Sequence, residues 1–300
     1  MNFERKSNEN YISSKSGDFA QLGEFGDEVR DYLLTQNNNP NAESFGLAAI
    51  EVRCDGGEVD FEEALDIVIS SIIEDEIVDA NLDECSKGIL DELKTLQSTD
   101  IAEIIKRFGD LNSIYDWEIK TETPPINSNT DAETDWKRDS NGLALDYDYL
   151  SFINPLYKNE ATKIGIARVI LHEMLHAYIL SHIDDVRNEN TSDFIEFREL
   201  WKMIQKDLTG FNNNPEPVHH EFMANKFIPP LKDALKEWDN SSQSNQYYED
   251  LAWGALIQTD TFDNLHPSGS TSRNRIINNN VAEDTNSLQG SISPKSSPCP

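Results

Sequence analysis

Basic residues are scarce in this chain relative to acidic ones, and this limits the partners that it can bind. The 300-residue sequence has 25 lysines and arginines against 55 aspartates and glutamates, with a formal net charge of −30. Its basic residues are scattered and form no local patch. A negative field of this size repels phosphate backbones and anionic lipid heads. We therefore expect no nucleic-acid partner and no membrane partner, and we attribute the acidity mainly to solubility.

Long apolar runs are also missing. No stretch of about 18 apolar residues occurs, so the sequence predicts no membrane-spanning helix. The N-terminal sequence MNFERKSNENYISSKSGDF lacks the hydrophobic segment of a signal peptide. These absences leave open a cytoplasmic location, export by a route other than the general secretory one, or a chain that belongs to something longer.

Cysteine is rare as well. Cys54, Cys85 and Cys299 are widely spaced, so they indicate neither a zinc ribbon nor a disulfide framework. A single Cys54–Cys85 bridge and two inert buried thiols are the alternatives.

What the sequence does contain is a patterned centre between two polar tails. Residues 1–25 and 267–300 are predicted to be disordered, residues 26–112 a helical region, and residues 113–266 the main domain. We expect an α+β fold, with a small sheet followed by a mainly helical half. The expected strands are Ser44–Arg53, Ile114–Thr121 and Gly142–Phe152, with a polar loop or hairpin over residues 123–141. The expected helices are residues 60–80 and 83–97, Asp100–Phe108, Asn159–Ser181, Asp193–Leu208, Pro217–Trp238 and Asn245–Gln258.

The helix predicted at Asn159–Ser181 is apolar nearly all round, yet it contains the stretch VILHEMLHAYI at residues 169–179. His172 and His176 lie one turn apart on the same helical face, where both imidazoles can reach one metal ion. Glu173 is rotated by roughly 100° from His172, beside such an ion and able to act as a general base. Burying three ionisable groups without partners would cost several kcal/mol. A bound Zn²⁺ offsets that cost.

A catalytic zinc ion needs a third protein ligand. The sequence HHEFMANKF, residues 219–227, offers His219, His220 and Glu221 at the start of a later helix. His220 shares its face with apolar residues that suit packing on the central helix, so we expect it to be the third ligand. Glu221 is the alternative, and His219 is also within the set. His182 and His266 are not expected to be ligands, and His182 is predicted to face solvent.

Residues 169–179 resemble the active-site helix of zincin-type zinc metallopeptidases. The stretch Ala224–Phe227 followed by Pro229-Pro230 is similar to the second metal helix of the ImmA/IrrE-type family, which implies Glu221 as the third ligand. SprT-like proteases, which use a third histidine, imply His220. The His-Glu and Met-Ala pairs, here His220-Glu221 and Met223-Ala224, also resemble metallopeptidase-like proteins of Bacteroidota. The resemblance further implies an edge strand that pairs with substrate, for which Gly142–Phe152 is the candidate.

These observations predict a zinc metallopeptidase with a protein or peptide substrate and with Glu173 as its base. Two alternatives remain: a non-catalytic interaction module in which metal staples helices together, and a secreted effector whose peptidase domain acts on one target. Arg168, Tyr247 and Tyr248 are candidates for stabilising the oxyanion. The carboxylates that could support the ligating histidines from behind are Asp184, Asp185 and Asp193.

Overall fold

The structure is a computed structural model that describes residues 77–97, 100–109, 113–125, 129–188 and 216–299. Nearly all of these residues belong to one compact unit, Ile77–Phe108 with Tyr115–Pro300, which is described here. Several predictions fall outside the described residues: the N-terminal tail 1–25, the strand Ser44–Arg53, most of the helix 60–80, and the helix Asp193–Leu208.

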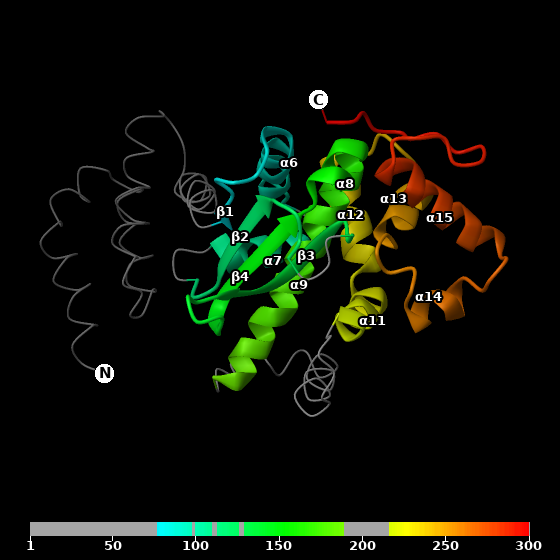
Figure 1. Ribbon diagram of the computed structural model, residues 1–300. Coiled ribbons are helices and arrows are strands. Elements are labelled where there is room, and N and C mark those ends of the chain that lie inside the picture. The colour runs from blue at the N-terminus through cyan, green and yellow to red at the C-terminus, as the bar shows by residue number, and fades with distance from the viewer. Residues whose placement is uncertain (1–76, 98–99, 110–112, 126–128, 189–215, 300) are drawn as a thin grey trace, which may run out of the picture. The chain divides into compact units, whose positions relative to one another are not determined.

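A four-stranded mixed sheet forms one layer of this unit (Figure 1). Its strands follow the order β1 (Ile77–Val78), β2 (Asp116–Thr121), β4 (Ala144–Ile153) and β3 (Ala132–Arg138). The β1–β2 and β2–β4 pairs are parallel, whereas β3 runs antiparallel to β4. The mixed α+β architecture is as predicted, and β2 and β4 match two of the expected strands.

The prediction that Gly142–Phe152 is an edge strand is wrong. β4 lies between β2 and β3, and β3 is an edge of the described sheet. The burial pattern gives the physical reason. The second half of β4 buries Tyr149, Phe152 and Ile153, as an inner strand does, whereas the β3 residues are mostly half-buried. β3 comes from the stretch that the sequence left as a polar loop or hairpin.

Two helices lie between β1 and β2 in the chain, and two more follow β4. α6 (Glu84–Lys94) and α7 (Asp100–Gly109) match their predictions. The helix predicted from Asn159 is divided into α8 (Pro155–Glu160) and α9 (Lys163–Arg187). The division arises because Thr162 is the N-cap of α9, its side chain accepting a hydrogen bond from the Gly165 backbone N–H. α9 packs against β3 and β4 and against helices on its other sides.

The C-terminal half is helical, as expected. Its elements are α11 (Glu216–Lys226), α12 (Ile228–Trp238), α13 (Asn245–Ala252), α14 (Asp260–Leu265) and α15 (Thr271–Asp284). The helix predicted at Pro217–Trp238 breaks at Phe227 because Pro229 and Pro230 occupy the first turn of α12, where a missing N–H is tolerated.

The C-terminal segment is not the disordered tail that was predicted from residue 267. It contains α15, which buries Ile276 and Ala282 and uses polar side chains for much of its remaining packing. The Asn279 amide donates to the Asp250 carboxylate at 2.7 Å, and the Asn280 amide donates to the Asp250 backbone carbonyl at 2.6 Å. Because this buried face is polar, the segment resembles a disordered tail in composition.

A disulfide joins Cys85 in α6 to Cys299, so Cys85 forms neither the Cys54–Cys85 bridge nor the free buried thiol that the sequence left as alternatives. The C-terminal segment that carries Cys299 also lies against the start of α9. There the Lys163 N–H donates to the Ser297 carbonyl at 2.8 Å and the Lys295 N–H donates to the Glu283 carboxylate at 2.6 Å. The end of the chain therefore supports the helix that carries His172 and His176.

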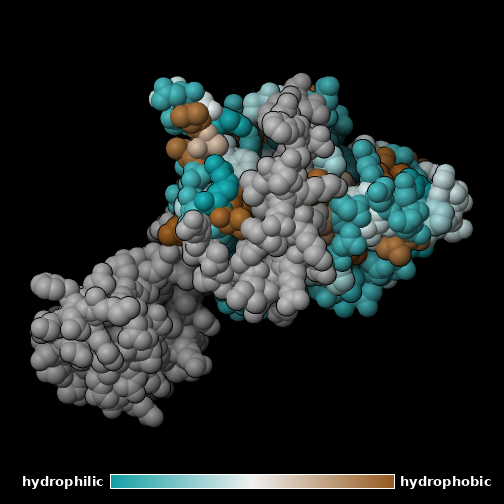
Figure 2. Space-filling view, turned by 90° about the horizontal axis from the view of Figure 1, so that it is seen from below, coloured by the Kyte–Doolittle hydropathy of each residue, from teal (hydrophilic) through white to brown (hydrophobic). Residues whose placement is uncertain are grey.

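By length and composition α9 is apolar enough to cross a membrane, and it is the one described helix of that kind. Its apolar stretch is wholly buried inside the fold, which identifies it as the core helix of this unit. The described surface seen in Figure 2 is mainly hydrophilic, with apolar side chains in small separate groups.

Candidate metal centre

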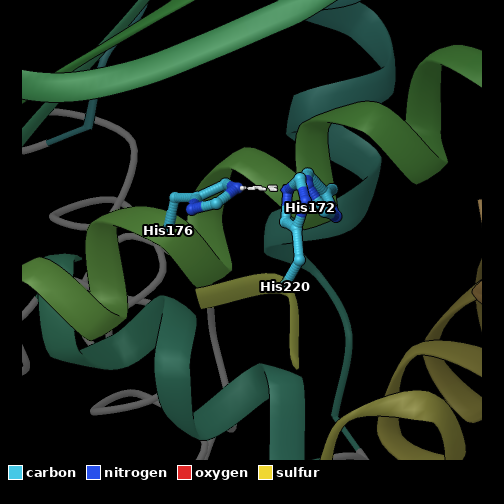
Figure 3. A group of neighbouring side chains, drawn as sticks. All are labelled: His172, His176 and His220. Atoms are coloured by element: carbon cyan, nitrogen blue, oxygen red, sulfur yellow. Dashed lines mark hydrogen bonds between the residues drawn. The ribbon is translucent and has the colours of Figure 1, made fainter. Parts of the chain in front are cut away.

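Three histidines from two helices meet beside the sheet. His172 and His176 project from one face of α9, and His220 projects from the first half of α11 (Figure 3). The His172 and His176 side chains are buried, whereas His220 is partly buried. Helical periodicity explains the first pair, because residues four apart lie one above the other. The third histidine arrives through the packing of α11 on α9.

The three Nε2 atoms form a nearly equilateral triangle. Nε2 of His172 lies 3.1 Å from that of His176 and 3.1 Å from that of His220, and the third side measures 3.2 Å. Hydrogen bonds cannot satisfy all three sides. A neutral imidazole presents either a proton or a lone pair at Nε2, so at least two of the three histidines must present the same one. Those two cannot form a hydrogen bond with each other. Three lone pairs directed at one cation satisfy every member of the triangle.

The size of the triangle fits a metal ion. Three nitrogens at about 2.0–2.1 Å from a tetrahedral zinc ion lie about 3.4 Å from one another. The observed separations of 3.1–3.2 Å are close to that value. The three histidines therefore lie close enough to bind one metal ion.

The protonation states of these histidines also favour metal binding. Burial, followed by the effect of neighbouring histidines, lowers the pKa of His172 and of His176 well below the usual 6.5. Burial lowers the pKa of His220 to about 4. The three imidazoles are therefore neutral near pH 7, which is the form that coordinates a metal ion.

The structure brings His220, and not Glu221, to the other two histidines. The Glu221 carboxylate instead faces α14, where it accepts hydrogen bonds from the Thr261 hydroxyl and from the Thr261 backbone N–H. It also accepts from the Asn225 amide at 3.0 Å. His220 and Glu221 are rotated by roughly 100° from each other on α11, so only one of them can face α9. The expectation based on packing agrees with this geometry.

His219 is placed differently from both His220, which belongs to the triangle, and Glu221, which accepts hydrogen bonds from α14. Its Nδ1 atom lies 3.3 Å from Nδ1 of His176, on the far side of the His176 ring from the triangle. If Nε2 of His176 holds a metal, its Nδ1 carries the proton and donates a hydrogen bond to Nδ1 of His219. Ligating histidines usually have such a partner on the other ring nitrogen. The sequence offered His219 as a ligand and missed this supporting position.

Glu173 is buried on the sheet side of α9. Its carboxylate accepts a hydrogen bond from the Thr134 hydroxyl of β3 at 2.7 Å, and this hydroxyl also lies 3.3 Å from the Glu173 backbone carbonyl. The residue predicted as general base therefore lies next to a ligand in the sequence and is held by the edge strand.

The candidate oxyanion groups are engaged elsewhere. Arg168 donates to Asn280 at 2.6 Å and to Asp284 at 2.7 Å, joining α9 to α15. The Tyr247 hydroxyl donates to Glu283 at 2.7 Å, and the Tyr248 hydroxyl donates to Asp239 at 2.5 Å. These contacts give all three residues a structural role.

The carboxylates proposed to support the ligands also have other partners. Asp184 accepts from the Trp136 indole and from the Tyr149 hydroxyl, both in the sheet. Asp185 accepts from Arg107 at 2.7 Å and from the Tyr115 hydroxyl at 2.6 Å. Both residues anchor the second half of α9, and Asp193 lies outside the described residues.

The two histidines that were not expected to be ligands, His182 and His266, lie outside the triangle, although one is placed differently from its prediction. His182 was predicted to face solvent, but only 1% of it is exposed. Its ring packs edge-on against the Tyr178 ring, with the two ring centroids 4.6 Å apart. The helix α9 continues past the predicted end at Ser181, so His182 remains inside the core. His266, at the end of α14, packs against Trp253 and Phe262.

His182 gives the fold a measurable dependence on pH. Burial, followed by the charge of Arg107, lowers its pKa from 6.5 to about 3. Below pH 6.5 the unfolded chain takes up a proton that the folded chain does not, so acidification favours unfolding. We expect His182→Gln to remove this contribution to the pH dependence of the unfolding free energy. The difference in unfolding free energy between wild type and variant should change by about 1.4 kcal/mol per pH unit between about pH 6 and pH 4.

Denaturant titrations at a series of pH values measure this difference. His266→Gln is the matched control, because His266 is only half-buried and the same substitution there should change the pH dependence less. A constant difference between wild type and His182→Gln across the range would contradict the buried, neutral state of His182.

Comparison with known proteins yields no match to a protein-family model, a curated protein or a solved structure.

Proposed function

We propose that this protein is a zinc-dependent metallopeptidase with a zincin-like arrangement of sheet and helices. The observation that carries the proposal is the triangle of Nε2 atoms from His172, His176 and His220, with the carboxylate-bearing Glu173 next to the first of them in α9. Catalytic zinc sites have three protein ligands and one open position. The triangle offers three nitrogens and no fourth histidine.

The chemistry of the ligand atoms supports zinc. The three groups are neutral imidazoles, which suit zinc and other late transition metals, whereas magnesium and calcium prefer oxygen ligands. Glu221, the one carboxylate considered as a ligand, instead accepts hydrogen bonds from Thr261 of α14. When bound here, zinc would supply a Lewis acid that activates water and polarises the scissile carbonyl.

The protein's own residues would handle the proton. Glu173 would accept a proton from the attacking water at its carboxylate and pass it to the leaving amine. The hydroxyl of Thr134 holds that carboxylate at 2.7 Å. His219 would keep the His176 ring in the tautomer that presents a lone pair at Nε2.

The edge strand supports a peptide as the substrate. β3 is an edge of the described sheet and runs antiparallel to β4, so its outer backbone groups can pair with an extended chain. Thr134 belongs to this strand and contacts Glu173. A peptide aligned on β3 would therefore lie close to the proposed base. We propose a protein or peptide substrate on this ground.

A second function has one observation in its favour. The metal would join α9 to α11, and the candidate oxyanion residues Arg168, Tyr247 and Tyr248 all make structural contacts. A metal that only staples two helices needs no such group. This would make the protein an interaction module.

The two functions are separated by assays on purified protein. Elemental analysis should find about one zinc ion per chain, the stoichiometry of a single catalytic site. Zinc-loaded protein should cleave unfolded casein or members of a peptide library, a chelator should abolish the cleavage, and added zinc should restore it. Full zinc occupancy with no cleavage of either substrate would favour the staple.

A further inference from the structure

A chain of hydrogen bonds crosses the sheet and ends on Glu173. The Trp117 indole of β2 donates to the Ser151 hydroxyl of β4 at 2.8 Å. The Ser151 and Thr134 hydroxyls lie 2.6 Å apart. The Thr134 hydroxyl of β3 lies 2.7 Å from Oε2 of Glu173. Three strands therefore contribute one side chain each to a single relay.

The chemistry of its two ends fixes the direction of the relay. An indole N–H can only donate, and a carboxylate in the ionised form that a general base requires can only accept. Trp117 therefore donates to Ser151, Ser151 donates its own proton to Thr134, and Thr134 donates to Glu173. Each hydroxyl receives one hydrogen bond and gives one. Aligned hydroxyls of this kind polarise one another, which strengthens each bond.

The relay is also rigid. Trp117 and Ser151 are fully buried. Thr134 and Ser151 are direct partners in the β3–β4 register, so the backbone sets their separation. Thr134 is also β-branched, which restricts the rotation of its side chain about χ1. The Glu173 carboxylate thus meets a donor whose position is determined by the sheet rather than by a flexible side chain.

We propose that Thr134, supported by Ser151 and Trp117, is a positioning residue for Glu173. The proposal rests on the proposed function and deepens it, because it assigns the edge strand the task of aiming the base. Glutamate has three rotatable side-chain bonds, so an unanchored Glu173 would spend much of its time away from the attacking water. Fixing Oε2 on β3 would set the position and orientation of the carboxylate that accepts the proton. Small misplacements of catalytic groups have large effects on rate.

The test compares Thr134→Val, which removes the hydroxyl but keeps the branched shape, with Thr134→Ser, which keeps the hydroxyl. For Thr134→Val we expect kcat to fall roughly ten- to a hundredfold, with KM and zinc content nearly unchanged. Thr134→Ser should recover most of kcat. Thr130→Val is the matched control, because the Thr130 hydroxyl bonds only to the nearby Ala132 carbonyl in the described structure. It should retain wild-type kcat.

Ser151→Ala provides a second variant if Thr134→Val does not fold. It removes the donor behind Thr134 but leaves the Thr134–Glu173 bond, so kcat should fall by less than in Thr134→Val. A Thr134→Val or Ser151→Ala enzyme with wild-type kcat would overturn the proposal. So would an equal loss in Thr134→Val and Thr134→Ser, because that result indicates a packing effect rather than the hydroxyl.

A readout that needs no activity separates this proposal from the proposed function. Crystal structures of zinc-loaded wild type and Thr134→Val should show the Glu173 carboxylate turned away from residue 134 in the variant and unmoved in Thr134→Ser. An unmoved carboxylate in Thr134→Val would refute the positioning role. If wild type cleaves no peptide, the proposed function fails, and these structures still decide whether Thr134 positions Glu173.

Discussion

Replacing Glu173 with glutamine should remove peptide cleavage while leaving the metal in place. Glutamine has nearly the same shape and can still accept a hydrogen bond from Thr134 through its amide oxygen, but it cannot take up a proton near pH 7. Loss of a general base lowers the rate by about 10²–10⁴-fold. We expect a fall of this size in kcat/KM with unchanged zinc content, since Glu173 is not among the three converging residues.

Glu221→Gln is the matched control for this experiment. It places the same substitution next to a proposed ligand on the other helix, where the carboxylate bonds to Thr261 rather than facing the histidines. Its activity should stay close to wild type. Cleavage that survives Glu173→Gln would rule out Glu173 as the base, even if the metal site is correct.

Replacing His220 with alanine should release the metal, whereas replacing Glu221 with alanine should not. His220→Ala leaves two nitrogens from α9 and removes the link to α11. Loss of a residue that only supports a ligand lowers metal affinity by roughly 10–100-fold, so loss of a ligand itself should exceed that range. Glu221→Ala should lower the free energy of unfolding, because it breaks hydrogen bonds between α11 and α14.

Competition with a chromophoric zinc chelator measures both affinities, and denaturant unfolding measures both stabilities. The pair of variants is informative because the two residues are neighbours in one helix. If Glu221→Ala releases zinc and His220→Ala does not, the assignment of the third ligand is wrong. If neither variant changes the affinity, the metal binds elsewhere.

Much of the site could be predicted because its signals are local. The spacing of His172 and His176 places them on one helical face whatever else the chain does. The choice of His220 depended on the phase of α11, which its apolar neighbours Ala224 and Phe227 indicate. Glu221 could not be dismissed from the sequence, because its partner Thr261 lies 40 residues away in α14.

The parts of the fold that were missed share a physical cause. β3 has the sequence AETDWKR, whose polar residues hide a strand that is only half-buried. α15 buries Asn279, Asn280 and Glu283, so its inner face lacks the apolar period by which helices are recognised. In both cases hydrogen bonds to distant partners replace the apolar contacts that a sequence pattern can show.

The supporting residues of the site were missed for a related reason. Thr134 reaches Glu173 across 39 residues of chain, and His219 reaches His176 across 43. Neither pair belongs to a local motif. A threonine in a polar stretch and a second histidine beside a proposed ligand have many roles open to them, and only the packing of β3 and α11 against α9 selects one.

The most direct test of the central claim is X-ray diffraction from crystals of zinc-loaded protein, collected above and below the zinc absorption edge. We predict one anomalous peak at about 2.0–2.1 Å from the Nε2 atoms of His172, His176 and His220. The same map should place the Glu173 carboxylate beside the peak and outside its ligand shell. No peak at this triangle, or a peak bound by Glu221, would contradict the account.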